Sequence, residues 1–168
     1  MQYDDAKYRF IQAWGTLGQS WGINKAMAQI HALLLISTEP LCTDDIMQEL
    51  NISRGNANMN VRALIDWGIV EKVYIPGDRK EYFNSEKDLW ALSRQVIVER
   101  KKRELEPLQK VLAEVQAVEG EGEEVEEFRK ITGDVDRFAQ RASAVLDQVT
   151  KSDKHWFFGP VLKLFGAG

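Results

Sequence analysis

One stretch of the chain, TDDIMQELNISRGNANMNVRALIDW at residues 43–67, constrains the fold more than any other. Thr43 is predicted to cap a short helix whose first turn carries two aspartates, because carboxylates are favoured at the positive end of a helix dipole. Asn51 and Ile52 then form a turn, and the hydroxyl of Ser53 is placed to cap a second helix that fills the rest of the stretch. Two short helices joined by a tight turn predict a helix-turn-helix.

The second helix has an unusual outer face. A period of 3.6 residues puts Ala57, Val61 and Leu64 on a buried stripe, whereas Glu and Lys are missing from the opposite side. Because Asn and Gly are poor helix formers, a requirement other than helix stability selects them, although a surface helix rich in Asn by accident is the alternative. Asn can pair with adenine, Arg with guanine or phosphate, and Met can contact a thymine methyl group. The predicted reading face consists of Gly55, Asn56, Asn58, Met59 and Arg62.

A two-stranded wing is predicted after the second helix. The alternation of residues 70–75 predicts a strand, and residues 81–84 can return beside it across the turn PGDRK. Arg79 and Lys80 at this turn would reach the DNA backbone or minor groove, although by themselves they fit a solvated turn better. The predicted fold class is therefore mainly α with a small β-hairpin wing, a winged helix-turn-helix with flanking dimerisation helices.

The first 35 residues hold two helical patterns, separated by WGTLGQSWGIN at residues 14–24, where glycines and tryptophans interrupt the periodicity. Asn24 can cap the second of these helices. His31 lies close to an apolar stripe and is expected to be a core or boundary histidine, since no second ligand or acid is spaced with it. Trp14 and Trp21 are expected to pack, and a cage for a small ligand is the alternative.

The second half of the chain is predicted to be helical. Ser85 is expected to cap a long helix that breaks or kinks near Glu106, because Pro107 cannot continue the hydrogen-bond ladder. The basic block at residues 100–103 fits a phosphate-facing role and a solvated face equally well. A flexible acidic connector, GEGEE, begins at Gly120.

Beyond the connector the apolar residues repeat at alternating steps of three and four. Such a heptad seam needs another helix, either the one before Gly120 or its copy in a second subunit. The apolar end, HWFFGPVLKLFGAG, is expected to pack on a partner surface. The seam consists of Phe128, Ile131, Val135, Phe138, Ala142, Val145 and Val149.

Charge and composition limit the function classes. The formal net charge of −4 argues against a general affinity for nucleic acid, but residues 104–136 carry −8 whereas residues 43–103 carry +1. DNA affinity would then depend on a few residues that contact the DNA directly, and on two copies of the chain. No apolar run is long enough for a transmembrane helix and no export signal is evident, so a cytoplasmic protein without membrane contact is expected.

Enzyme and metal chemistry find little support in the sequence. A single cysteine, Cys42, and two histidines, His31 and His155, provide neither a disulfide nor a structural zinc site, and no cofactor is expected. Cys42 fits a small semi-buried residue better than a redox switch. There is no phosphate-binding glycine loop, no HExxH and no supported catalytic pair, so the chain is predicted not to be an enzyme.

At this point the residues resemble a known family, the GbsR-like branch of the MarR-type winged-helix transcriptional regulators. The resemblance rests on WGINKAMAQIHALLLIS at residues 21–37, DDIMQELNISRGNANMNVRALIDWGIV at 44–70 and GDRKEYF at 77–83, and it covers roughly residues 10–105. It implies a homodimeric repressor of a DNA operator that responds to a small-molecule effector. Residues matching the positions that such proteins present to DNA are Ser53, Arg54, Asn56, Asn58, Asn60, Arg62, Arg79 and Lys80.

The expected organisation has three parts. Residues 1–23 form an N-terminal dimerisation helix, residues 24–85 the winged helix-turn-helix DNA-binding domain, and residues 86–168 a C-terminal helical dimerisation region. The acidic C-terminal extension is not part of the family motif, so effector and dimer geometry do not carry over. The alternative function is a winged helix for protein–protein contact without DNA binding, which would favour an apolar or acidic reading face.

Overall fold

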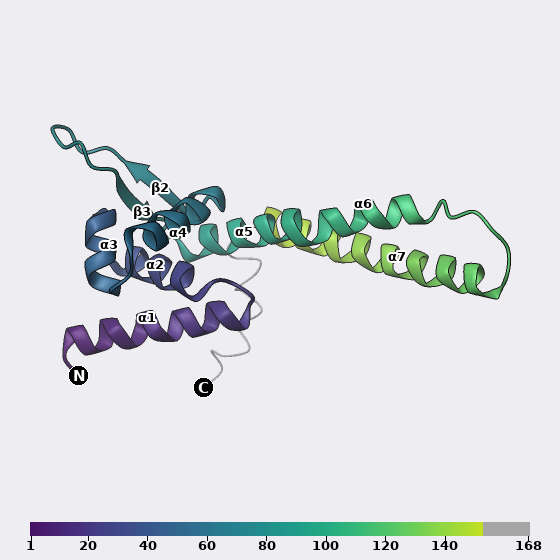
Figure 1. The fold of residues 1–168 in the computed structure, drawn as a ribbon, viewed down its shortest axis with the longest axis horizontal. Coiled ribbons are helices and arrows are strands. Elements are labelled where there is room, and N and C mark those ends of the chain that lie inside the picture. Colours follow the sequence, from purple (N-terminus) through teal and green to yellow (C-terminus); the bar gives the residue numbers. More distant parts are fainter. Residues whose placement is uncertain (153–168) are drawn as a thin grey trace. The chain divides into compact units, whose positions relative to one another are not determined.

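The computed structural model describes residues 1–152 and is mainly helical, with a small antiparallel sheet (Figure 1). The described residues divide into two compact units, one of residues 1–92 and one that begins at Ser93. The elements confirm the predicted fold class, a mainly α protein with a small β wing. In chain order they are α1 (Tyr3–Ser20), α2 (Lys25–Ile36), β1 (Leu41–Cys42), α3 (Thr43–Leu50), α4 (Arg54–Asp66), β2 (Val70–Val73), β3 (Tyr82–Ser85), α5 (Leu89–Arg100), a π-helical turn (Lys101–Leu105), α6 (Glu106–Val115) and α7 (Glu123–Lys151).

The core of the first unit is built around α2. This helix packs against α1, α3, α4 and β3, and nearly all of its middle is buried. Each fully buried aliphatic side chain contributes roughly 1.5–3 kcal/mol to folding, so this cluster fixes how α3 and α4 sit on α2. Fully buried members are Ile30, Leu33 and Leu34 of α2, Ile46 of α3, and Val61 and Leu64 of α4.

Helix α1 continues to Ser20, through the first part of the interruption predicted at residues 14–24, and only residues 21–24 separate it from α2. Gly15 and Gly18 are buried within α1, where the helix crosses α2 closely. A Cβ atom at Gly18 would lie 2.5 Å from the Cβ of Ala28, and one at Gly15 would lie 2.7 Å from Cγ of Gln29. The glycines therefore allow close packing rather than end the helix. Asn24 caps α2 as predicted, because its Oδ1 accepts from the amides of Ala26 and Met27.

The sheet has three strands in the order β1-β3-β2, all antiparallel. The β2–β3 hairpin was predicted, but β2 ends at Val73, before the exposed Tyr74 and Ile75. The short strand β1 was not predicted, because two residues are too few for a periodic signal. It pairs Leu41 with the buried Phe83, so the wing is anchored directly to the start of the helix-turn-helix.

The prediction that Ser85 caps the next helix is wrong. Ser85 is a buried residue of β3, and its hydroxyl donates to the carbonyl of Ile69. Asp88 takes the capping role instead, because its carboxylate accepts from the amides of Trp90 and Ala91 at the start of α5. Between them, the ammonium of Lys87 donates to three carbonyls at the end of α2, those of Leu34, Leu35 and Ser37.

The second unit begins within α5. The expected irregularity before Pro107 takes the form of the π-helical turn Lys101–Leu105, after which α6 continues with Pro107 in its first turn. The chain therefore stays helical past Pro107, with a π-helical turn where a break or kink was expected. In the basic block, Arg100 pairs with Glu104, Lys101 with Asp147 and Arg103 with Glu99, which favours the solvated structural role.

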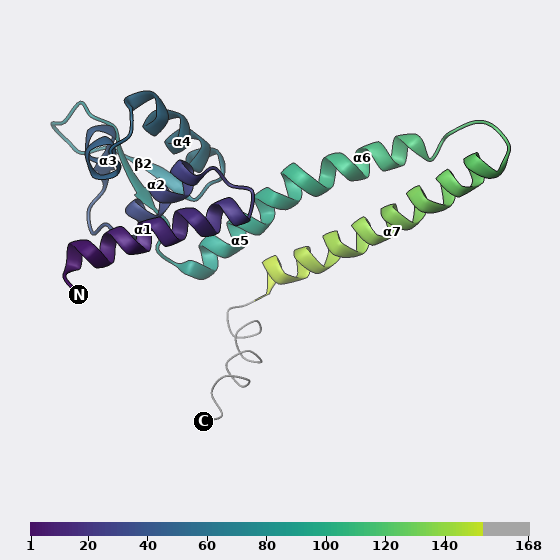
Figure 2. The same ribbon diagram turned by 60° about the horizontal axis from the view of Figure 1, so that its bottom comes forward.

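Helices α6 and α7 run side by side in opposite directions and are joined by residues 116–122 (Figures 1 and 2). Leu112 of α6 and Ala139 of α7 are buried in this unit, where α7 packs on α6 and on the π-helical turn. The predicted heptad seam lies on α7, but α6 does not cover it, and Phe138 is 73% exposed. Members of the seam that stay exposed are Phe128, Ile131, Val135, Phe138 and Val145.

Two further expectations concern membrane-spanning helices and the apolar C-terminal tail. No helix within residues 1–152 is long and apolar enough to cross a membrane. The apolar tail at 155–168, with His155, lies outside the described residues.

Candidate nucleic-acid interface

The turn between α3 and α4 forms as predicted. Asn51 ends α3 in the left-handed conformation with φ 51°, which Asn tolerates better than most residues. Ser53 then caps α4, because its Oγ accepts the amide of Asn56 at 3.3 Å. These local hydrogen bonds fix where α4 begins and therefore which of its side chains face outward.

Thr43 is not the cap of α3, contrary to prediction. The cap position belongs to Cys42, whose amide donates to the carboxylate of Asp45 at 2.8 Å. Thr43 is already in the helix, and its hydroxyl donates to Oδ1 of Asn58 on α4 at 3.1 Å. Thr43 therefore orients Asn58 of the reading helix instead of capping the N-terminus of α3.

The outer face of α4 is largely as the sequence indicated. Ala57, Val61 and Leu64 form the buried stripe. On the other side Met59 is 61% exposed, Arg62 is exposed, and Asn58 is half-buried. A Cβ atom at Gly55 would meet nothing within 4 Å, so the backbone there is open to close approach. A shallow open depression is lined by Gly55, Asn58, Met59, Arg62, Ala63 and Asp66.

Asn60 differs from its prediction. It is only 3% exposed, so it does not face outward with its neighbours. Its Nδ2 donates to the backbone carbonyl of Asn56 at 2.9 Å and to Oδ1 of Asn56 at 2.5 Å. A helical period places residue 60 between the buried Ala57 and Leu64, and a polar residue at that place is buried with its hydrogen bonds satisfied inside the helix.

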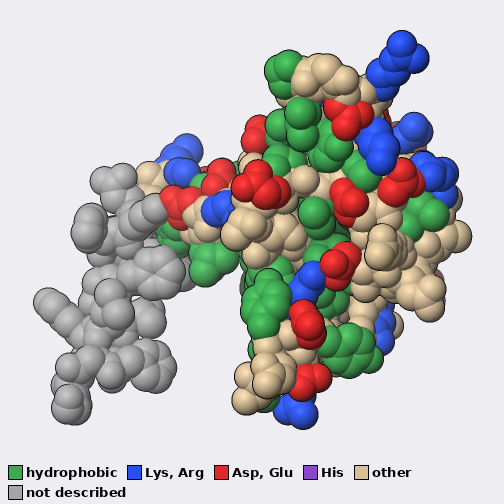
Figure 3. All heavy atoms as spheres, turned by 90° about the vertical axis from the view of Figure 1, so that its left-hand side faces the viewer, with side chains coloured by type: hydrophobic (Ala, Val, Ile, Leu, Met, Phe, Trp, Pro, Cys, Tyr) green, Lys and Arg blue, Asp and Glu red, His purple; other side chains and the backbone are tan. Residues whose placement is uncertain are grey.

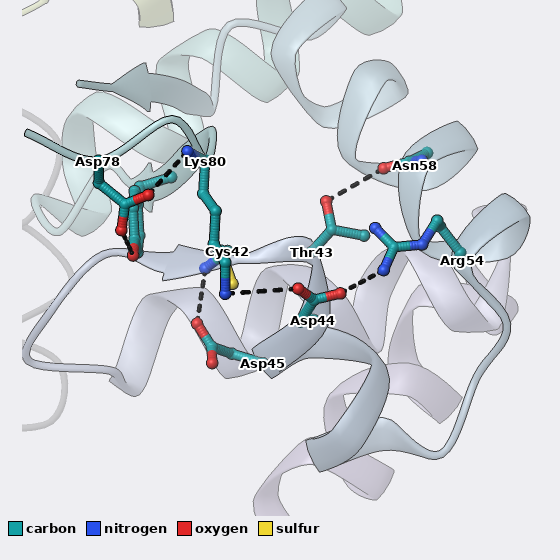
Figure 4. A network of polar contacts seen from close by, with 9 residues as sticks. Cys42, Thr43, Asp44, Asp45, Arg54, Asn58, Asp78 and Lys80 are labelled. Atoms are coloured by element: carbon teal, nitrogen blue, oxygen red, sulfur yellow. Dashed lines mark hydrogen bonds and ion pairs between the residues drawn. The ribbon is translucent and has the colours of Figure 1, made fainter. Parts of the chain in front are cut away.

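One carboxylate, which sequence reasoning missed, joins three elements of the site (Figure 4). Asp44 of α3 accepts a hydrogen bond from Arg54 of α4 and pairs with Nζ of Lys80 in the wing at 3.5 Å. The hydrogen bond from Arg54 is the main reason that the pKa of Asp44 is lowered, with a smaller contribution from Lys80. The sequence carried a signal only for a favourable acid at a helix start, not for its two partners.

A second carboxylate shapes the tip of the wing. Asp78 accepts the amide of Lys80 at 2.9 Å and the hydroxyl of Tyr82 at 2.8 Å, and both bonds lower its pKa. The same bond raises the pKa of Tyr82 to about 12. Gly77 turns the chain with φ 88°, a conformation that glycine adopts without strain. The turn that carries Arg79 and Lys80 is therefore held by its own hydrogen bonds.

Charges of both signs surround the candidate interface. Figure 3 shows Lys and Arg side chains gathered at the upper right of that face, with carboxylates between them. Arg54 and Lys80 belong to the paired cations. Arg62 and Arg79, by contrast, form no ion pair within residues 1–152. Two of the four predicted cations are thus available to an external anion without breaking an internal pair.

The predicted tryptophan pair lies in two different environments. Trp14 packs its ring near Phe10 and His31, and its Nε1 donates to Nδ1 of His31 at 3.2 Å. Trp21 follows the end of α1 and is 56% exposed. His31 is buried in the core, as expected. A ligand cage made by the two tryptophans stays a prediction. No group of three metal-binding side chains occurs among residues 1–152.

Comparison with known proteins supports the fold. No family model and no curated protein matches the chain. A solved structure described as a transcriptional regulator is 21% identical, covers 85% of this chain and 99% of that chain, and superposes with a TM-score of 0.57. A second, described as the structure of GAS PerR-Zn-Zn, is 24% identical over 40% of this chain and 48% of that chain, with a TM-score of 0.36. The first likeness extends beyond residues 1–92 and shows a shared fold.

Proposed function

We propose that the chain is a sequence-specific regulator of transcription that binds a double-stranded DNA operator with α4. The observation that carries this proposal is the outer face of α4, where Met59, Arg62 and the open backbone at Gly55 are displayed. A major groove admits an α-helix, and these groups suit base edges and phosphates. The hydrogen-bonded wing tip with Arg79 adds a backbone or minor-groove contact.

The finer assignment follows the sequence resemblance. We propose a member of the GbsR-like branch of the MarR-type regulators, a cytoplasmic homodimeric repressor without catalytic activity. Residues 24–85 would bind DNA, and residues 1–23 and 86–168 would form the dimer. The proposed DNA contacts are Ser53, Arg54, Asn56, Asn58, Met59, Arg62, Arg79 and Lys80. Asn60 is withdrawn from this set because it is buried.

Selection of operators from a random DNA pool tests the proposal. We expect a pseudo-palindromic site whose half-site centres lie about 10 base pairs apart, because a two-fold dimer places two reading helices in successive major grooves. Arg62→Ala is expected to cost about 1–3 kcal/mol on the selected operator and to relax the preference at one base pair. Arg79→Ala is expected to weaken all sequences alike and to lower the slope of log affinity against log salt by about one.

These two substitutions form a matched pair, because each removes one exposed arginine that has no ion-pair partner within residues 1–152. Base reading and phosphate anchoring give different signatures, so each variant controls for the other. If both variants stay folded and bind the operator like the wild type, the reading assignment is wrong. A winged helix for protein–protein contact would then replace it.

We also propose a small-molecule effector, with Trp14 and Trp21 as the residues to examine. Trp14 donates to the buried His31, so a ligand that displaces this bond would change tryptophan fluorescence. Quaternary amines are the first compounds to screen, since aromatic side chains bind them. A compound that shifts both fluorescence and operator affinity supports effector control. If none alters operator binding, the chain is a constitutive regulator.

A further inference from the structure

We propose that α4 presents the side-chain NH2 groups of Asn56 and Asn58 to the base edges, and therefore selects guanine at those positions. The inference rests on the proposed DNA-binding function and goes beyond it by naming the base. Free asparagine side chains favour adenine, because an amide offers one donor and one acceptor. In this chain each of the two amide oxygens accepts an internal hydrogen bond, which turns the NH2 group toward a ligand.

The orientation of Asn56 is fixed by the buried Asn60. The side chain of Asn60 lies 2.9 Å from the backbone carbonyl of Asn56, which accepts only, so the nitrogen of Asn60 must face it. The same nitrogen is 2.5 Å from Oδ1 of Asn56. If Asn56 were turned over, two NH2 groups would face each other. The NH2 group of Asn56 is therefore the group left for a ligand.

The orientation of Asn58 follows from Thr43. The threonine hydroxyl donates to Oδ1 of Asn58 at 3.1 Å, from a different helix (Figure 4). This bond occupies one lone pair of the amide oxygen and leaves the NH2 group of Asn58 for a ligand. Thr43 belongs to α3, so the packing of α3 on α4 determines which half of the amide is available.

The rest of the reading segment offers no acceptor to compete. Residues 54–62 contain no carboxylate, and the guanidinium of Arg62 donates only. Asp44 lies beside the segment, but its carboxylate is occupied by Arg54 and Lys80. Asp66 lines the same shallow depression, but it is the last residue of α4 and follows Arg62 by one turn, at the opposite end from the Ser53 cap. The described face is therefore rich in donors where it meets the groove.

The acceptors on the base edges explain why such donors would prefer guanine. In the major groove guanine presents two acceptors, N7 and O6, whereas adenine presents one acceptor, N7, beside an amino donor, thymine presents one acceptor, O4, and cytosine presents only an amino donor. An outward NH2 group can donate to both guanine acceptors, but to only one acceptor of adenine or thymine and to none of cytosine. A preference for guanine over adenine of about ten-fold at each such position is the expected size.

Operator selection with three variants tests the inference. For the wild type we expect guanine at the bases reached by Asn56 and Asn58. Asn60→Leu removes the anchor of Asn56, so the amide can turn over and adenine becomes acceptable, which lowers the guanine preference at that position about ten-fold. Asn56→Asp replaces the outward NH2 group by an oxygen, so guanine is lost and cytosine gained. Asn84→Ala removes an amide from β3 as a matched control and is expected to leave the selected sequence unchanged.

The outcomes separate the inference from the proposed function. Adenine at the contacted bases in the wild type, or an unchanged base preference in both Asn60→Leu and Asn56→Asp, overturns the inference while DNA reading stands. A pool from which the wild type selects no sequence overturns the proposed function itself. Circular dichroism checks folding, and Asn56→Asp keeps the test decisive if Asn60→Leu does not fold, because an acid in the first turn favours a helix.

Discussion

At the scale of single residues, His31 is held neutral by its surroundings. It is 5% exposed, and its Nδ1 accepts the indole N–H of Trp14, so the ring proton is on Nε2. Within the described chain Nε2 has no hydrogen-bond partner, and an unpaired buried donor costs about 1–3 kcal/mol. Burial, and to a lesser extent the charge of Lys87, lowers the pKa of His31 from 6.5 to about 4.

The lowered pKa of His31 predicts that acid destabilises the fold. The unfolded chain takes up a proton below pH 6.5, whereas the folded chain does so only near pH 4, so the free energy of unfolding falls as the pH is lowered through this window. The total loss is about 3 kcal/mol. Urea unfolding between pH 7 and 4 measures it, and His31→Leu is the control that keeps the titration of all other groups. Equal pH dependence in the two proteins would contradict this account.

Predictions for single residues succeeded where the role of a side chain depends only on residues close to it in the sequence. Ser53 and Asn24 cap helices as predicted, because a cap depends on amides two or three residues away. Thr43 and Ser85 were assigned by the same rule and do not cap, since a tertiary partner, Asn58 or the carbonyl of Ile69, takes their hydroxyls. Residue type alone does not show which partner is nearer.

At the scale of elements, Asp44 connects α3, α4 and the wing. Its pairs with Arg54 and Lys80 are exposed to solvent, so each adds little to the stability of the fold. A phosphate group can therefore replace the carboxylate at little cost. Asp44 then opposes DNA binding by neutralising two cations that the proposed function assigns to the operator.

We expect Asp44→Asn to raise the affinity for DNA of any sequence. The substitution frees Arg54 and Lys80, so the slope of log affinity against log salt is expected to steepen by up to about two contacts. Glu49→Gln is the matched control, because it removes one carboxylate from the same helix, where Glu49 pairs with Lys7 of α1. Binding titrations at several salt concentrations measure both. An unchanged slope in Asp44→Asn would show that the two cations do not reach phosphates.

The crossing of α1 and α2 gives a stability prediction. Gly18→Ala would place a Cβ atom 2.5 Å from that of Ala28, so the two helices must separate, at a cost of roughly 1–3 kcal/mol. Gly133→Ala is the control in α7, where a Cβ atom meets only Nη1 of Arg137 at 3.6 Å. Alanine is the better helix former, so the control is expected to stabilise by about 0.5–1 kcal/mol. Urea unfolding distinguishes the two signs.

Element types were more predictable than their details. The reading helix and the β2–β3 hairpin follow from periodicity, which spans many residues. The two-residue strand β1 has no periodicity, and its existence depends on pairing with Phe83. The glycines of α1 suggested a break because a sequence shows their low helix propensity but not the helix against which they pack.

At the scale of the whole molecule, the apolar seam of α7 is the feature that a single chain leaves unexplained. Periodicity revealed the seam but could not decide between α6 and a second subunit. The structure shows α6 packed beside α7 while Phe138 and Ile131 stay exposed. The first half of α7, residues 123–136, carries six acids and two bases, and residues 137–151 carry one acid and three bases. An antiparallel pairing of two α7 helices would match these opposite charges.

We predict a homodimer of about twice the 19.2 kDa chain mass by light scattering. Phe138→Glu places a charge in the middle of the seam and is expected to give monomers at micromolar concentration, because a charge desolvated at an apolar interface is unfavourable. Gln148→Glu adds the same charge elsewhere on α7 and is expected to leave the dimer intact. A wild-type monomer, or a Phe138→Glu dimer, would exclude the seam as the interface.

Under the proposed function, dimerisation through the exposed seam would also make regulation sensitive to the concentration of the chain. Below the dissociation constant of the dimer, the amount of dimer rises with the square of the chain concentration, so operator occupancy would change more steeply than expression does. A chain with an intact seam and a defective α4, such as Arg62→Ala, would still pair with wild-type chains. Co-expressed in excess, it would convert most wild-type subunits into dimers with one reading helix, and a defect in one copy would be dominant.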